Sequence, residues 1–170
     1  MRQEILRKGA KVKRWHTITN VKEQTVADHS WGVASIILDV WPDSSNSLIT
    51  YALWHDIPEF VVGDVPVTAK WANEDLARAV EKAESQIAKK YKLFIELTET
   101  EKLKLAIADL LEVLWYASEE IALGNSNFLE VFHTARKKLK TLIQPMYNNP
   151  SEKISAKYIT RIINNLRSKI

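Results

Sequence analysis

Apolar residues recur along most of the chain at the spacing of three and four residues that is typical of amphipathic helices. The first clear example lies between Thr25 and Pro42, and its apolar face consists of Val33, Ile36, Ile37 and Val40. Thr25 and Asp28 form the pattern of a capping box, which opens a helix, whereas Pro42 cannot continue one. The pattern therefore predicts a helix over residues 26–41.

The same reasoning predicts five more helices. One is expected to begin with Ser47 as its N-cap, to bend at Pro58, which has no backbone donor, and to end at Gly63. Thr98 and Glu101 form another capping box, which opens a long helix. The predicted ranges are about 47–63, 73–91, 98–124, 127–144 and 151–167.

Glycine and proline are scarce, with four and five residues, which is too few for an all-β protein built on tight turns. No internal repeat, low-complexity tract or long linker divides the chain. We therefore expect an all-α fold, with one domain over residues 1–170 built as a bundle of six or seven helices.

Composition narrows the class of protein further. Cysteine is absent, which excludes disulfide scaffolds, thiolate metal sites and thiol nucleophiles. No run approaches the roughly 18 apolar residues of a membrane span, and residues 1–15 lack the apolar stretch of a signal peptide. We expect a soluble, cytoplasmic protein without a membrane partner. The net charge of +3 suits a small phosphate-bearing ligand but is too low to indicate binding to a nucleic-acid polymer.

Two of the four histidines stand on predicted inward faces beside acidic residues. His29 lies on the apolar face of the first predicted helix, and His55 is followed directly by Asp56. Asp109 interrupts the apolar run of residues 105–111, where an unpaired carboxylate would be costly. Two imidazoles and two carboxylates suit manganese, iron, cobalt or zinc better than magnesium or calcium. Spacing alone leaves a buried His–Asp network without a metal equally open.

A series of short motifs in a fixed order extends this picture. The motifs are Arg14-Trp15, Val26-Ala-Asp-His29-Ser30, Leu53-Trp-His55-Asp56-Ile-Pro-Glu59, Gly63-Asp64-Val-Pro66 and Ala108-Asp109. In this order they are far more specific than a single His-Asp pair. Over residues 10–130 the chain resembles the HD-domain phosphohydrolases. Within that class it looks most like the bacterial 5'-deoxynucleotidases and the shorter bacteriophage enzymes that hydrolyse dATP to deoxyadenosine and triphosphate.

The resemblance implies roles for single residues. It implies one divalent transition metal (Co, Mn, Zn or Fe), with a second divalent ion on the substrate phosphates. The implied ligands of the first metal are His29, His55, Asp56 and Asp109. It also implies that Glu59 is the catalytic carboxylate, and its place one turn after His55 agrees, because both would face the same way. Asp64 would bond to the sugar 3'-hydroxyl or the catalytic water, or would only cap its own turn.

Three further residues are expected at the substrate. The resemblance implies that Arg14 holds the phosphate with its bidentate guanidinium. Lys70 would extend this clamp, unless it is simply exposed to solvent. Trp15 would form a wall at the deoxyribose that excludes a 2'-hydroxyl, or would be a core aromatic. His16 and His133 match no ligand position, and we expect them to be structural.

The expected reaction is hydrolysis of the bond between the 5'-oxygen and the α-phosphorus of a deoxynucleotide. The compact chain and the basic residues Lys11, Lys13 and Lys70 favour a triphosphate of the dATP type. The alternatives are a 5'-deoxynucleotidase acting on monophosphates and a non-catalytic HD domain that binds a nucleotide. Because relatives self-associate, we also expect a homo-oligomer, with Trp41 and Trp71 as candidates for an exposed apolar patch.

Overall fold

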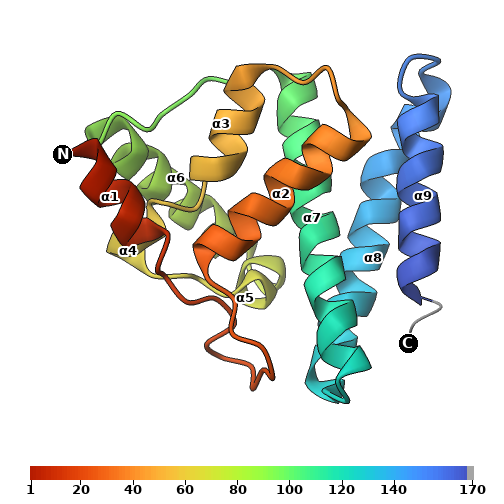
Figure 1. The fold of residues 1–170 in the computed structure, drawn as a ribbon, viewed down its shortest axis with the longest axis horizontal. Helices are drawn as coiled ribbons and strands as arrows, with labels where there is room; N and C mark the ends of the chain where they lie inside the picture. The colour runs from red at the N-terminus through yellow and green to blue at the C-terminus, as the bar shows by residue number, and fades with distance from the viewer. Residues whose placement is uncertain (168–170) are drawn as a thin grey trace.

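The fold is entirely helical. The computed structural model describes residues 1–167, and these form nine α-helices and two short 3₁₀ helices (Figure 1). Over this range there is no β-strand, only an isolated antiparallel bridge between Lys13 and Thr25. The predicted all-α class is therefore confirmed. None of the helices described is long and apolar enough to cross a membrane.

Five of the six predicted helices are present as single helices, and the sixth, predicted over residues 47–63, is divided into two. The α-helices are α1 (Arg2–Gly9), α2 (Val26–Val40), α3 (Asn46–Trp54), α4 (Glu59–Val62), α5 (Val67–Ala72), α6 (Glu74–Lys90), α7 (Glu99–Ala122), α8 (Leu129–Ile143) and α9 (Lys153–Arg167). The 3₁₀ helices η1 (Ser126–Phe128) and η2 (Gln144–Asn148) lie on either side of α8. The described part of the chain contains more than six or seven helices because α1 and α5 are short additions and because the turn at Pro58 separates α3 from α4.

Capping residues explain where the longer helices begin. Thr25 and Thr98 both form capping boxes, as predicted. The cap of α3 is Ser45 rather than the predicted Ser47, because the Ser45 hydroxyl accepts a hydrogen bond from the N–H of Leu48 at 3.1 Å. The helix therefore starts two residues earlier than the sequence suggested.

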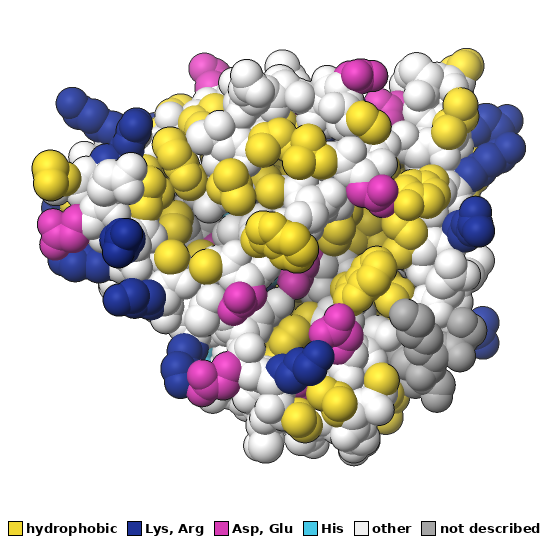
Figure 2. All heavy atoms as spheres, viewed as in Figure 1, with side chains coloured by type: hydrophobic (Ala, Val, Ile, Leu, Met, Phe, Trp, Pro, Cys, Tyr) yellow, Lys and Arg dark blue, Asp and Glu magenta, His cyan; other side chains and the backbone are white. Residues whose placement is uncertain are grey.

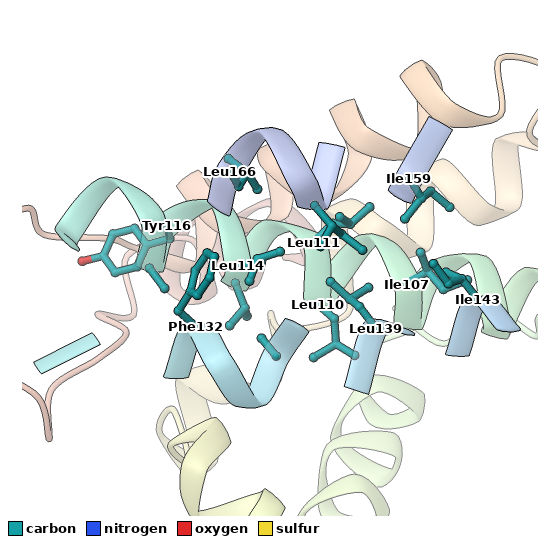
Figure 3. Close-up of a cluster of buried hydrophobic side chains, with 14 of the residues drawn as sticks. Ile107, Leu110, Leu111, Leu114, Tyr116, Phe132, Leu139, Ile143, Ile159 and Leu166 are labelled. Atoms are coloured by element: carbon teal, nitrogen blue, oxygen red, sulfur yellow. The ribbon is translucent and has the colours of Figure 1, made fainter. Parts of the chain in front are cut away.

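The largest cluster of buried apolar side chains lies between α7, α8 and α9. Figure 3 shows side chains of these three helices converging, among them Leu111 of α7, Leu139 of α8 and Ile159 of α9. A second cluster joins α7 to α2 and α3. Helix α7 is therefore held on two sides by packed core, which makes it a rigid support for the polar residues it carries.

The N-terminal segment is attached to the other helices at two points. Residues 10–15 run beside the start of α2, where the N–H of Arg14 donates to the carbonyl of Gln24 at 2.9 Å. Helix α1 ends against the turn between α3 and α4. A Cβ added to Gly9 would stand only 2.7 Å from the carbonyl oxygen of Ile57, so the two backbones approach closely there.

The exposed tryptophans are not those expected from the sequence. The prediction of an exposed patch is wrong for Trp41, which is 6% exposed, and Trp71 packs partly against the same core. Trp31 and Trp115 are the exposed ones, at 70% and 41%. Figure 2 shows apolar side chains gathered over α2 and on toward α9, while Lys and Arg lie mostly nearer the rim of this face.

Candidate active site

Two histidines and two aspartates meet where the turn between α3 and α4 lies against α2 and α7. His29 comes from α2, Asp109 from α7, and His55 and Asp56 from the turn. Nε2 of His29 lies 3.0 Å from Oδ1 of Asp109 and 3.5 Å from Oδ2 of Asp56. Nε2 of His55 lies 3.2 Å from Oδ1 of Asp56. The four residues predicted as metal ligands are therefore gathered in one cluster.

Both imidazole rings present the same nitrogen to this cluster. Nδ1 of His55 donates to the carbonyl oxygen of Ala52 at 2.8 Å, and Nδ1 of His29 donates to Oε2 of Glu112 at 2.5 Å. A carbonyl and a carboxylate can only accept, so Nδ1 carries a proton in each ring. Neither buried Nε2 atom makes a hydrogen bond. Both Nε2 atoms are thus left for another partner.

These groups fit a divalent transition metal. Ligand atoms of His29, His55 and Asp109 lie within 4.8 Å of one another. Imidazole nitrogen combined with carboxylate oxygen suits zinc, manganese, iron or cobalt. Burial and Arg14 lower the pKa of His29, but Glu112 and Asp109 outweigh them and raise it to about 9. A cation bound at Nε2 would displace the proton there and would lie between His29 and the carboxylate of Asp109.

Arg14 is fixed beside the cluster by Asp56. Its Nη1 donates to Oδ2 of Asp56 at 2.5 Å, and the two side chains are only 9% and 13% exposed. Burial alone would raise the pKa of Asp56, but His55, Arg14 and His29 outweigh it and hold the pKa well below its usual range. The ion pair therefore persists at neutral pH, with the guanidinium next to the predicted metal ligands.

Glu59 is the first residue of α4 and is 1% exposed. Both of its carboxyl oxygens are buried and make no hydrogen bond. Burial and the neighbouring Asp56 raise the pKa of Glu59 to about 9, against the lowering effect of Arg14. The carboxyl group therefore holds a proton at neutral pH that it can give to an acceptor.

Asp64 follows Gly63, whose φ of +78° is a conformation that favours glycine. The Asp64 side chain is 7% exposed, and its Oδ2 lies 3.5 Å from Nδ1 of His16. His16, which the sequence left without a role, is therefore the neighbour of a predicted site residue. The other such histidine, His133, lies on α8.

A cavity of about 600 Å³ opens over the cluster, a size that suits a small-molecule ligand. Four predicted site residues line it, namely His55, Asp56, Lys70 and Asp109. Aromatic and aliphatic side chains form much of the remaining wall, together with Glu81, Glu84, Glu96 and Lys102. Arg14, His29 and Glu59 are buried and are not among the residues that line it.

Trp15 lies in the core against α7 and η1. It is 4% exposed, stacks on Tyr116 with ring centroids 5.5 Å apart and meets Phe128 edge-on at 5.2 Å. Its indole Nε1 donates to Oε1 of Gln24 at 2.7 Å. This is the core position that the sequence left open as the alternative for Trp15, and a role at the sugar stays a prediction.

Glu112 was missed by the sequence analysis although a signal for it exists. It is a charged residue within the apolar stretch of residues 110–114, which is the argument that singled out Asp109. Gln24, which donates to Glu112 at 2.7 Å, carries no such signal, because a glutamine before a helix is ordinary.

Solved structures share this arrangement of helices. The cyanophage S-2L HD phosphohydrolase, determined with dA and one catalytic Zn²⁺ ion, is 14% identical with a TM-score of 0.71, and 97% of this chain and 96% of that chain are covered. An HD-domain phosphohydrolase from Listeria innocua is 23% identical with a TM-score of 0.71, covering 98% and 88%. The fold is that of the HD phosphohydrolases.

Fold and site together define a metal-dependent hydrolase of the HD-domain class. The chain belongs to the 5'-deoxynucleotidase YfbR-like family, whose profile matches residues 3–158. A 5'-deoxynucleotidase of Cronobacter sakazakii is 30% identical, covering 78% of this chain and 77% of that protein. A dATP triphosphohydrolase of Salmonella phage PMBT28 is 32% identical over a shorter match, which covers 35% of this chain and 37% of that protein.

Proposed function

We propose that the protein hydrolyses the bond between the 5'-oxygen and the α-phosphorus of a deoxynucleotide. The observation that carries the proposal is the convergence of His29, His55 and Asp109 on one point, with Arg14 held beside it by Asp56. These two histidines and two aspartates would hold one Co, Mn, Zn or Fe ion. When bound, such an ion polarises a phosphoryl oxygen and lowers the pKa of nearby water.

The other residues of the cluster have distinct tasks in this reaction. Arg14, and Lys70 on the cavity wall, would bind phosphate oxygens and neutralise the charge that develops as water adds to phosphorus. Glu59 would give its proton to the leaving 5'-oxygen as the P–O bond breaks. Asp64 would bond to the 3'-hydroxyl or orient the water. Trp15 would form a wall at the deoxyribose that excludes a 2'-hydroxyl.

The substrate is either a deoxynucleoside triphosphate or a deoxynucleoside monophosphate. A triphosphate is favoured by Lys70 and by the similarity to the phage dATP triphosphohydrolase, and a second divalent ion would then neutralise its tail. A monophosphate is favoured by the family match and by the three glutamates on the same cavity wall, which repel a highly charged tail. The bond that is cut is the same in both cases.

Turnover of a deoxynucleotide panel tests the proposal. The panel pairs each monophosphate with its triphosphate, with Co²⁺, Mn²⁺ or Zn²⁺ added, and identifies the phosphorus product. Orthophosphate from a monophosphate supports a 5'-deoxynucleotidase, and inorganic triphosphate supports a triphosphohydrolase. Nucleotide binding without turnover under all conditions would instead leave a non-catalytic nucleotide-binding HD domain.

A pair of histidine variants separates the metal from the fold in this test. His55→Ala should remove bound metal and turnover together, because it deletes one of the converging Nε2 atoms. His133→Ala, on α8, is the matched control and should keep both. A His55→Ala protein with one metal per chain and full turnover would show that the assignment of ligands is wrong.

A further inference from the structure

A chain of buried hydrogen bonds leads from the metal cluster into the core. Nδ1 of His29 donates to Oε2 of Glu112 at 2.5 Å. Nε2 of Gln24 donates to Oε1 of the same carboxylate at 2.7 Å, and Nε1 of Trp15 donates to Oε1 of Gln24 at 2.7 Å. The residues are between 0% and 8% exposed, so water competes little for these bonds and each group depends on the next.

The chemistry of the four groups allows this chain only one direction. An indole N–H can only donate, so Gln24 turns its oxygen to Trp15 and its NH₂ group to Glu112. The other carboxylate oxygen of Glu112 is then free to accept from Nδ1–H of His29. As a result, Nδ1 keeps its proton and Nε2 is the nitrogen that faces Asp109 at 3.0 Å.

Helix α2 leaves room for this carboxylate. Gly32 lies one turn after His29, and a Cβ added to it would stand 2.8 Å from Cγ of Glu112. Glycine inside a helix is unfavourable compared with alanine. The close approach of Glu112 accounts for a glycine at this position, because any side chain there would push the carboxylate away from His29.

The far end of the chain reaches the segment that carries Arg14. The backbone N–H of Arg14 donates to the carbonyl of Gln24, next to the side-chain bond from Trp15. Trp15 has a φ of 61°, a left-handed conformation that non-glycine residues rarely adopt and that persists only when its surroundings hold it. Gln24 therefore holds the backbone from which the Arg14 side chain reaches Asp56.

We propose that Glu112 and Gln24 are positioning residues for the hydrolysis. Glu112 fixes His29 as a ligand through Nε2, and Gln24 joins that ligand to the segment that presents Arg14. Both residues line a separate cavity of about 650 Å³, and their side chains contact His29, Trp15 and each other, so their roles are exerted through His29 and the segment of Arg14. The proposal rests on the proposed metal site, and its tests therefore measure metal binding apart from turnover.

Glu112→Gln is the first test. The new amide can accept from His29 only by turning its NH₂ group toward the NH₂ group of Gln24, which leaves two donors facing each other. We expect the affinity for Zn²⁺, measured by competition with a chelating dye, to fall by about tenfold or more. Glu120→Gln is the matched control: Glu120 is a fully buried glutamate of the same helix that accepts from the N–H groups of Val21 and Lys22. It should lower Tm and leave the affinity unchanged.

A double variant provides the rescue. Gln24→Glu combined with Glu112→Gln restores the order of donors and acceptors, because a carboxylate at 24 accepts both from Trp15 and from the new amide. The double variant should recover most of the lost Zn²⁺ affinity, whereas Gln24→Glu alone sets two carboxylates face to face and should weaken binding. If Glu112 and Gln24 had a purely structural role, combining two substitutions that each weaken Zn²⁺ binding would not be expected to restore it.

Equal Zn²⁺ affinity in the wild type, Glu112→Gln and Glu120→Gln would overturn the proposal, and so would a double variant no better than Glu112→Gln. If Glu112→Gln does not fold, Gln24→Met takes its place, and wild-type affinity in that variant would equally overturn it. A wild-type protein that binds Zn²⁺ but hydrolyses no deoxynucleotide would refute the proposed function, while the order of affinities would still decide the positioning roles.

Discussion

Glu59 has an environment unlike that of an ordinary surface glutamate. Both oxygens are buried without a hydrogen bond, and burial and Asp56 raise the pKa of Glu59 to about 9. Glu59→Gln keeps the size of the side chain and removes the acidic proton. We expect kcat to fall roughly 100-fold or more, with bound metal and KM close to wild type. Steady-state kinetics and metal analysis check this, and a large rise in KM at unchanged kcat would contradict it.

Glu84 gives the stability of the protein a pH dependence. Burial raises the pKa of Glu84 from 4.5 to about 7, although Lys70 lowers it. The stabilising contribution of this proton is fully present below pH 4.5 and is lost as the pH rises through 7. Glu84→Gln removes that loss. The free energy of unfolding of the variant, relative to that of the wild type, should therefore rise by up to ~3 kcal/mol between about pH 5 and pH 8.

Urea unfolding of both proteins at the two pH values measures this difference. The exposed Glu81 lines the same cavity and lies on the same helix, so Glu81→Gln is the matched control for the removal of one carboxylate from this wall. A Glu84→Gln protein that differs from wild type by the same amount at both pH values would show that Glu84 does not titrate in this range.

Single residues differ in how far the sequence reveals them. Asp109 was predictable because a carboxylate within an apolar run requires a partner. The same signal was present for Glu112, but its partner His29 lies 83 residues away in sequence, so the pairing depends on how α2 and α7 pack. The burial of Trp15 likewise depends on Tyr116 and Phe128, about a hundred residues further along the chain.

At the scale of the helices, local patterns predicted the long elements and missed the short ones. Both capping boxes were confirmed, because they depend on residues close in sequence. The helix predicted over residues 47–63 was expected only to bend at Pro58, and this was wrong, because a turn separates α3 from α4 there. The predicted start of α3 was wrong by two residues. Ser45 donates to Oε1 of Glu101 at 2.5 Å as well as capping the helix, and this contact between distant segments favours Ser45 over Ser47. Helix α5 has too few residues to establish a pattern.

The contact between α1 and the α3–α4 turn makes a prediction about helix packing. Gly9→Ala would improve the helix propensity of α1, but its Cβ would stand 2.7 Å from the carbonyl oxygen of Ile57, a backbone atom that cannot move aside easily. We expect a loss of about 1–3 kcal/mol in the free energy of unfolding. Because Ile57 follows Asp56, metal affinity should fall as well.

Chemical unfolding and Zn²⁺ titration measure the two effects of Gly9→Ala. Lys8→Ala, an exposed change on the same helix, is the control and should stay within about 0.5 kcal/mol of wild type. An alanine at position 9 that stabilises the protein would mean that α1 can move away from the turn at little cost.

At the scale of the whole molecule, α7 connects the core to the chemistry. One side of α7 packs in the large cluster with α8 and α9, and another side carries Asp109 and Glu112 toward α2 and the α3–α4 turn. This division explains why the helices beyond residue 125, which contain none of the predicted site residues, still matter: they fix the helix that carries the predicted metal ligand Asp109.

The exposed apolar side chains over α2 lead to the last prediction, which concerns assembly. Trp31 belongs to α2 and is 70% exposed. Figure 2 shows apolar side chains gathered over this helix. Self-association would bury such a patch in a symmetric interface. We expect light scattering at micromolar concentration to give at least twice the chain mass of 19.5 kDa, and Trp31→Lys to shift the mass toward that of one chain. Leu76→Lys, on α6, should leave the assembly intact. A wild-type mass near 19.5 kDa would refute the homo-oligomer, and an unchanged assembly in Trp31→Lys would place the interface elsewhere.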